Sequence, residues 1–285
     1  MTGRLPPVES WPVVVVGADV RDEVTDAVVV EEPLEIAVRD GEDGPAAPLT
    51  VTLRTPGADA ELATGLLYAE GVIACGDDVL EIRTAAITEG ASFPNRLEVR
   101  VRRGLAADLS GAQRTFISTA ACGLCGKVAV DAVFAKGFPP LLPGEPRIGR
   151  AVLAALAGRM RAAQTLFART GGLHAAALFD SEGELVLLRE DVGRHNAVDK
   201  VIGALLTARR LPAERALLVV SGRAGFEITQ KALRAGIPLL AAVGAPSSLS
   251  LRLAARAGMT LVGFLRADRF NLYTAPGRVT DEPAA

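Results

Sequence analysis

The sequence predicts an α/β protein with a three-layer core, preceded by a smaller, strand-rich N-terminal subdomain. Three observations lead to this fold class. After residue 146, strand-like and helix-like segments alternate with short links, an order typical of parallel strands joined by right-handed crossovers. Before residue 137, segments that alternate apolar and polar residues dominate, as in half-buried strands. The length of 285 residues is also more than one small hydrophobic core needs.

The N-terminal subdomain is expected to span residues 21–136, after a flexible lead-in over residues 1–20. One helix is predicted within it, in "GADAELATGLLYAEGVI", beginning near Asp59 and ending at Gly71. Its strands are expected in "VVVEEPLEIAV", "PLTVTLRTP" and "NRLEVRVR". A Pro- and Gly-rich break, "GFPPLLPGEP" at residues 137–146, separates this part from the core.

The core, residues 147–285, is predicted to follow the order α-β-β-α-β-α-β-α-β. Its helices are expected in "RAVLAALAGRMRAAQTLFART", "HNAVDKVIGALLTARR", "FEITQKALRAG" and "SSLSLRLAARAG". Its strands are expected in "LHAAALFD", "ELVLLRED", "ALLVVSG", "PLLAAVG" and "MTLVGFLR". This pattern is typical of the cytidine-deaminase-like fold. In such sheets ligands favour the loops beyond the carboxyl ends of the strands.

The composition is that of a soluble globular enzyme, with 49% hydrophobic and 22% charged residues. A net charge of −2 gives no reason to expect bulk binding to nucleic acid or to a membrane surface. No apolar run approaches the roughly 20 residues of a transmembrane helix, and the first ten residues lack a signal-peptide pattern. Cysteine is too scarce for a secreted disulfide framework, so we expect a cytoplasmic protein.

A CxxC motif, Cys122 and Cys125 in "STAACGLCGK", is the first chemical candidate. Structural zinc is disfavoured because no second CxxC supplies the remaining ligands. A zinc deaminase needs a Glu proton shuttle, and Ala176 stands where an H-x-E motif would place it. A thioredoxin-type redox role is disfavoured because a predicted loop, and not a strand, precedes this CxxC. Flanking glycines and the neighbouring Lys127 favour a mobile thiolate that carries sulfur as a persulfide, with buried structural cysteines as the alternative. Cys75 is expected to fill the core.

Two loops are suited to phosphate, "SGRAGFE" at residues 221–227 and "GAPSSLS" at residues 244–250. Each is predicted to end a strand and open a helix, where small residues and free backbone N–H groups can approach an anion. Arg223 adds a planar fork, and Ser247 is either a hydroxyl donor or a helix cap. Arg266 and Arg269 follow the last predicted strand, where they either bind phosphate or lie in a solvated tail.

The segment "REDVGRHNAVDK", residues 189–200, concentrates charged and polar side chains at a strand-to-helix junction. Asp191 or Asn196 could simply cap the following helix. His195 in this segment and His174 at the start of an earlier strand are predicted to lie at the same edge of the core. This convergence favours a functional role for that edge over a purely structural one.

Taken together, these motifs resemble the FdhD family, the accessory sulfurtransferases required for formate dehydrogenase activity. The matching stretches are "STAACGLCGK", "TGGLHAAAL", "EDVGRHNAVDKVIG", "SGRAGFEITQKALRAGIPLLAAVGAPSSLS" and "LVGFLRADRFNLYT", with "EEPLEIAV" and "ATGLLYAEGVI" in the N-terminal part. The resemblance implies a sulfur relay: a cysteine desulfurase passes sulfur to the CxxC, and the protein delivers it to the molybdenum cofactor, bis-molybdopterin guanine dinucleotide. It also implies a cytidine-deaminase-like fold without the deaminase residues, and a homodimer.

By the same resemblance, Cys122 would bear the persulfide and Cys125 would assist or share that role. The cofactor-binding segment would be Phe264, Leu265, Arg266, Ala267, Asp268 and Arg269. Given the guanine nucleotides of the implied cofactor, our hypothesis is that Arg223, Ser247, Arg266 and Arg269 contact phosphate or guanine, so GDP-like nucleotides should act as mimics. A non-catalytic cofactor chaperone for formate dehydrogenase is the alternative function.

Overall fold

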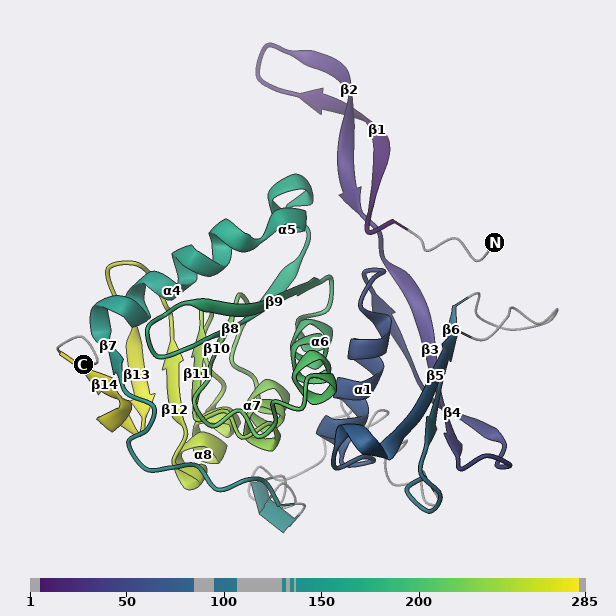
Figure 1. Cartoon of the computed structure of the whole chain (residues 1–285). Coiled ribbons are helices and arrows are strands. Elements are labelled where there is room, and N and C mark those ends of the chain that lie inside the picture. The colour runs from purple at the N-terminus through teal and green to yellow at the C-terminus, as the bar shows by residue number, and fades with distance from the viewer. Residues whose placement is uncertain (1–5, 85–94, 107–129, 132–133, 136, 282–285) are drawn as a thin grey trace.

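A computed structural model describes residues 6–84, 95–106, 130–131, 134–135 and 137–281 (Figure 1). The core is built on a six-stranded sheet with the order β13-β12-β11-β10-β8-β9. Strands β10, β11 and β12 are parallel, whereas β8, β9 and β13 join them as antiparallel neighbours. Their bounds are β8 His174–Phe179, β9 Leu185–Asp191, β10 Leu217–Val220, β11 Leu239–Ala242, β12 Thr260–Gly263 and β13 Asn271–Thr274.

Helices cover both faces of this sheet, which gives the three predicted layers. On one face lie α6 (Arg194–Thr207), α7 (Phe226–Arg234) and α8 (Ser248–Ala257), and on the other lies α4 (Arg150–Ala163) (Figure 1). Strand periodicity explains the arrangement, because Leu218 and Val220 belong to the hydrophobic cluster with α6–α8. Their neighbours Leu217 and Val219 belong to a second cluster with Leu153 and Leu156 of α4.

The N-terminal part is a four-stranded sheet packed on one helix. Its strand order is β4-β3-β6-β5, with β3 Glu32–Asp40, β4 Ala46–Arg54, β5 Val79–Thr84 and β6 Arg96–Val101. Helix α1 (Asp59–Glu70) ends at Gly71, which has a left-handed backbone, as the sequence predicts. One hydrophobic cluster contains buried residues from both this sheet and the core, so the two predicted parts share a hydrophobic interior.

Helix α1 and helix α6 cross in very close contact through two glycines. A Cβ placed on Gly65 would lie 1.9 Å from the carbonyl oxygen of Asp199. A Cβ on Gly203 would lie 1.9 Å from the carbonyl oxygen of Glu61. The absence of side chains at these two positions therefore sets the distance between the N-terminal part and the core.

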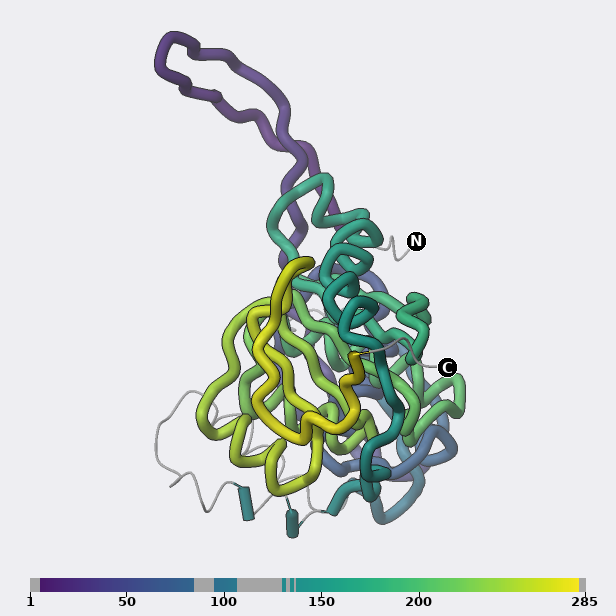
Figure 2. The backbone as a smooth tube through the Cα atoms, turned by 90° about the vertical axis from the view of Figure 1, so that its left-hand side faces the viewer, coloured from purple at the N-terminus to yellow at the C-terminus, as the bar shows by residue number. Residues whose placement is uncertain are grey.

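Residues 8–29 form a two-stranded hairpin that extends away from the body (Figures 1 and 2). The sequence predicted a flexible lead-in over residues 1–20, and this is wrong for residues 8–16. They form strand β1 (Val8–Val16), which pairs antiparallel with β2 (Arg21–Val29) along its whole length. The expected strand "VVVEEPLEIAV" is divided between β2 and β3. Branched and aromatic side chains favour this extended backbone, although Trp11 and Val16 are exposed.

Two further expectations are wrong. The single helix expected over residues 150–170 is two helices, α4 and α5 (Thr165–Thr170), because the backbone of Gln164 departs from helical angles. Cys75 does not fill the core but is exposed, at the start of the short helix η1 (Gly76–Asp78). The carboxylate of Asp78 accepts the backbone N–H groups of Ala74 and Cys75 and fixes that turn.

The C-terminal segment is anchored by a buried arginine. Elements η2 (Pro276–Arg278) and β14 (Val279–Thr280) return beside β7 (Ile148–Gly149). The Arg278 guanidinium is buried and donates to the carbonyl oxygens of Leu142, Glu145 and Gly258. Within the described ranges, no helix is both long and apolar enough to cross a membrane.

Candidate functional site

A cavity of about 800 Å³ lies between helices α4–α5 and the carboxyl ends of the parallel strands. Its floor is formed by residues that directly follow strands: Ser221 after β10, Val243 after β11, and Leu265 and Arg266 near the end of β12. Its opposite wall, called the roof below, includes Met160 and Arg161 of α4, Gln164 between α4 and α5, and Phe167 of α5. The volume is in the range of small-molecule sites, and the position agrees with the ligand edge expected from the strand order.

The loops that follow β10, β11 and β12 are joined side by side by backbone hydrogen bonds. The N–H of Gly244 donates to Gly222 O at 2.9 Å, and the N–H of Phe264 donates to Gly244 O at 3.1 Å. A Cβ on Gly244 would lie 2.8 Å from Gly222 O, so only glycine permits this approach. The two phosphate-suited loops and the predicted cofactor-binding segment therefore form one continuous, rigid edge.

Arg266 is the best placed of the predicted phosphate-binding residues. Its Nη1 donates to the carbonyl oxygens of Val243 and Leu265, both at 2.8 Å, which fixes the guanidinium at the cavity. A guanidinium has five N–H groups, so the Nε and Nη2 hydrogens remain for a ligand. Leu265 is fully buried and Ala267 is exposed, and both also line the cavity.

The other predicted ligand contacts lie outside this cavity lining. Phe264 is exposed and has a φ of 53°, a strained left-handed backbone that turns the chain at the end of β12. Asp268 and Arg269 are exposed, and the carbonyl oxygen of Arg269 accepts the N–H of Arg266. Arg223 is exposed on the loop before α7.

Ser247 caps a helix, the structural alternative that the sequence left open. It lies at the N-cap of α8, where its Oγ accepts the N–H of Ser250 at 3.2 Å. A hydroxyl that accepts a capping bond can still donate its own hydrogen to a ligand.

The two histidines do lie at the same edge, as predicted. The Nδ1 of His174 is 3.5 Å from Ser221 Oγ, and His174 lines the cavity. Burial, and then the charge of Arg194, lowers the pKa of His174. Burial, with the charges of Arg194 and Lys231, lowers the pKa of His195 to about 4. Both imidazoles are therefore neutral near pH 7, although His195 Nε2 lies 3.3 Å from a Glu227 carboxylate oxygen.

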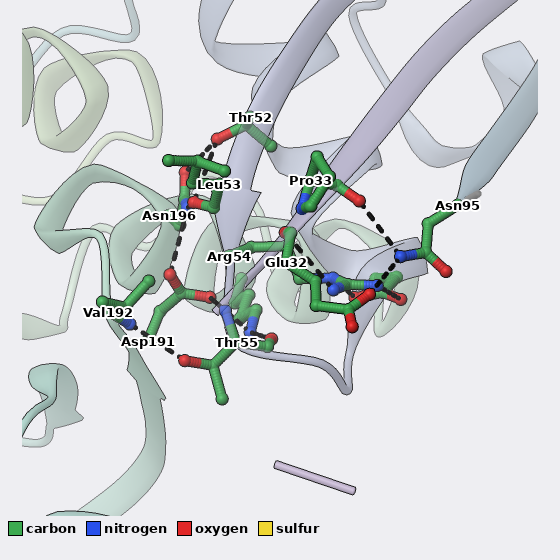
Figure 3. A network of polar contacts seen from close by, with 12 residues as sticks. Glu32, Pro33, Thr52, Leu53, Arg54, Thr55, Asn95, Asp191, Val192 and Asn196 are labelled. Atoms are coloured by element: carbon green, nitrogen blue, oxygen red, sulfur yellow. Dashed lines mark hydrogen bonds and ion pairs between the residues drawn. The ribbon is translucent and has the colours of Figure 1, made fainter. Parts of the chain in front are cut away.

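Buried polar groups hold the start of α6 against the N-terminal sheet (Figure 3). The fully buried Asp191 accepts Nζ of Lys200 at 2.6 Å and Nδ2 of Asn196 at 3.0 Å. Lys200 also donates to Thr55 O at 3.0 Å, and Asn196 donates to Leu53 O at 2.8 Å. Asp191 and Asn196 are therefore not simple helix caps: they connect β4 to the helix that carries His195.

A second buried pair lies deeper between α6 and α7. Nζ of Lys231 is 2.5 Å from Oδ1 of Asp199, and both side chains are almost completely buried. Burial raises the pKa of Asp199, and this effect outweighs the lowering by Lys231. Lys231 also contributes to the low pKa of His195. The pair thus links the packing of two core helices to the electrostatics of the site.

The two cysteines of the CxxC motif, Cys122 and Cys125, lie outside the described residues. Residues just beyond that segment pack on the core, because Val130 is buried in the large hydrophobic cluster and Asp131 pairs with Arg256 of α8.

The match to a protein family covers most of the sequence. The model of the FdhD/NarQ family matches residues 29–280. The chain belongs to the FdhD/NarQ family. The matched range includes both parts of the fold, the cavity and the CxxC segment.

Individual relatives are similar over nearly their whole length. The sulfur carrier protein FdhD of Mycobacterium tuberculosis is 48% identical over 265 residues, 90% of this chain and 92% of that protein. The protein of the same name from Streptomyces avermitilis is 48% identical over 263 residues, 91% of each chain. The crystal structure of a formate dehydrogenase accessory protein from Desulfotalea psychrophila has a TM-score of 0.72 and 26% identity, covering 96% of this chain and all of that one.

Sequence reasoning missed the roof of the cavity. Gln164, Phe167 and Arg161 come from a stretch that was interpreted as one uninterrupted helix, so no ligand contact was expected there. None of the residues around Gln164 is a helix breaker, and the local sequence gave no signal.

Proposed function

We propose that this chain is a sulfur carrier that takes sulfur from a cysteine desulfurase and delivers it to bis-molybdopterin guanine dinucleotide for formate dehydrogenase. Membership of the FdhD/NarQ family and the names of the relatives support a sulfur-carrier role. The observation that carries the proposal furthest is the cavity at the strand ends. Arg266 is fixed there with three N–H groups left to bind the phosphates of a nucleotide.

In the proposed sulfur step, the Cys122 thiolate attacks the outer sulfur of the desulfurase persulfide. The donor S–S bond breaks, and the donor cysteine leaves as a thiolate. Attack of Cys125 on the inner sulfur of Cys122 then releases hydrosulfide for the cofactor and leaves a disulfide, which a cellular thiol reduces. The cofactor is here the substrate, and Arg223, Ser247 and the segment from Phe264 to Arg269 are its proposed contacts.

The proposal also covers the fold type of the core, the oligomeric state and the location of the protein. The core keeps the cytidine-deaminase-like description, for which the three parallel strands speak, but without deaminase activity, because Ala176 in β8 replaces the Glu that a deaminase needs. A homodimer in the cytoplasm, with GDP as a mimic of the substrate, completes it.

The test is persulfide mapping on Cys122→Ala and Cys125→Ala. After incubation with a desulfurase and free cysteine, mass spectrometry should find one added sulfur atom on Cys122 of the Cys125→Ala protein. The Cys122→Ala protein should fail to restore formate dehydrogenase activity in a strain that lacks the native carrier. Full restoration by Cys122→Ala would refute sulfur transfer and favour the non-catalytic chaperone.

A further inference from the structure

One wall of the cavity contains Gln164, a largely buried residue whose side-chain amide has no hydrogen-bond partner within the described residues. Gln164 links α4 to α5 and is only 3% exposed. Its backbone is used, because its N–H donates to Arg161 O and its carbonyl accepts the N–H of Ala168. Within the described part of the chain, no donor or acceptor pairs with its side-chain amide, and the residue lines the cavity.

The small exposed area of this residue lies at the cavity, so a polar ligand group or an ordered water there can pair with the amide. The amide offers an acceptor, Oε1, beside a donor, Nε2. This pair matches the edge of a planar base that has an N–H next to a carbonyl oxygen, as guanine does at N1 and O6.

A flat surface adjoins the amide. The guanidinium carbon of Arg161 lies 3.8 Å from the ring centroid of Phe167, and both residues line the cavity. Stacked aromatic and guanidinium planes are common contacts for a nucleic-acid base. The Phe167 N–H donates to a carboxylate oxygen of Glu190 at 2.8 Å, which holds this wall in place.

We propose that Gln164, with the Arg161–Phe167 stack, recognises the guanine base of the ligand whose phosphates bind at Arg266. The inference rests on the proposed function for the identity of the ligand. Beyond that function, the inference assigns Gln164, at the break between α4 and α5, as the residue that hydrogen-bonds the base. The two ends of the ligand are thus assigned to opposite walls of one cavity, the roof for the base and the strand ends for the phosphates.

Isothermal titration calorimetry with GDP and with inorganic pyrophosphate tests this assignment. The Gln164→Met variant keeps the volume but loses both hydrogen bonds, so GDP should bind about tenfold to a hundredfold more weakly. Its affinity for pyrophosphate should stay within about twofold of wild type, because that probe has no base. The Arg266→Ala variant should weaken both ligands.

Gln164→Glu and Arg169→Ala complete the set. Glu retains an acceptor for the N–H groups of guanine, so its GDP affinity should lie closer to wild type than that of the Met variant. Arg169 is exposed on α5 outside the cavity lining, and its removal should change neither ligand.

Two results would overturn the base assignment. The Gln164→Met variant could bind GDP with the affinity of wild type, or its affinity for pyrophosphate could fall as much as its affinity for GDP. If wild type binds neither probe, the nucleotide ligand of the proposed function is wrong as well. The persulfide test does not use these probes, so the two failures are distinguishable.

Discussion

Substituting Gly203 with alanine should separate helix α1 from helix α6 and destabilise the whole chain. The added Cβ would lie 1.9 Å from Glu61 O and 2.6 Å from the carbonyl carbon of the same residue. Because Cβ atoms essentially never come within 3.0 Å of such an atom, the helices must part by roughly 1 Å. The obstacle is backbone, which cannot rotate aside as a flexible side chain would.

The expected net loss follows from two opposing effects. Overpacking a filled interface costs about 1–3 kcal/mol, and a contact with backbone belongs at the upper end of that range. The higher helix propensity of alanine raises the free energy of unfolding by about 1 kcal/mol relative to glycine. We therefore expect Gly203→Ala to lower the free energy of unfolding by about 2 kcal/mol.

Urea unfolding followed by circular dichroism measures this change, with Gly158→Ala as the matched control. Gly158 lies in α4, where an added Cβ meets nothing within 4 Å. That variant should gain about 0.5–1 kcal/mol from propensity alone. The reasoning would be refuted if Gly203→Ala were as stable as wild type, or more stable in the manner of the control.

Two other substitutions test the electrostatics. Lys200→Met leaves Asp191 buried without its cation and should lower the free energy of unfolding, measured in urea, by about 3–5 kcal/mol. The double variant Lys200→Met/Asp191→Asn should recover part of that loss. An unchanged urea midpoint for Lys200→Met would contradict this reasoning. The pKa of His195 is lowered from 6.5 to about 4 in the folded state, so protonation favours unfolding. Stability should fall as the pH drops from 6.5 toward 4, by about 1–2 kcal/mol after allowing for partial exposure; His195→Gln should flatten that slope, and parallel pH profiles would show that another group is responsible.

The order of helices and strands along the core, and with it the ligand edge, could be predicted from the sequence because hydrophobic periodicity and the alternation of strand and helix are strong signals. They placed Ser221 and Arg266 at the ends of predicted strands, and the structure has both residues in the cavity lining. The stop of α1 at Gly71 was equally predictable, since glycine readily adopts the left-handed backbone that ends a helix.

Features that depend on distant contacts were not predictable. The break at Gln164 is stabilised by Glu190, whose carboxylate accepts the N–H groups of Leu166 and Phe167 more than 20 residues earlier in the chain. Asp191 also accepts the N–H of Thr55, a residue just after β4 and remote in sequence, so a helix cap was the simplest local interpretation. The N-terminal hairpin, by contrast, could have been predicted. The valines of β1 are a local strand signal, but the segment was interpreted as a flexible lead-in.

The crossing of α1 and α6 also constrains how the chain is made. Gly65 and Gly203 are 138 residues apart, so a ribosome working at about 5–20 residues per second needs about 7–30 s to add the second after the first. Throughout that interval Leu62 and Leu67, both buried in the finished protein, lack the helix that covers them. Newly made N-terminal chain is therefore the form most in need of a chaperone, and premature termination before α6 should yield an aggregating fragment.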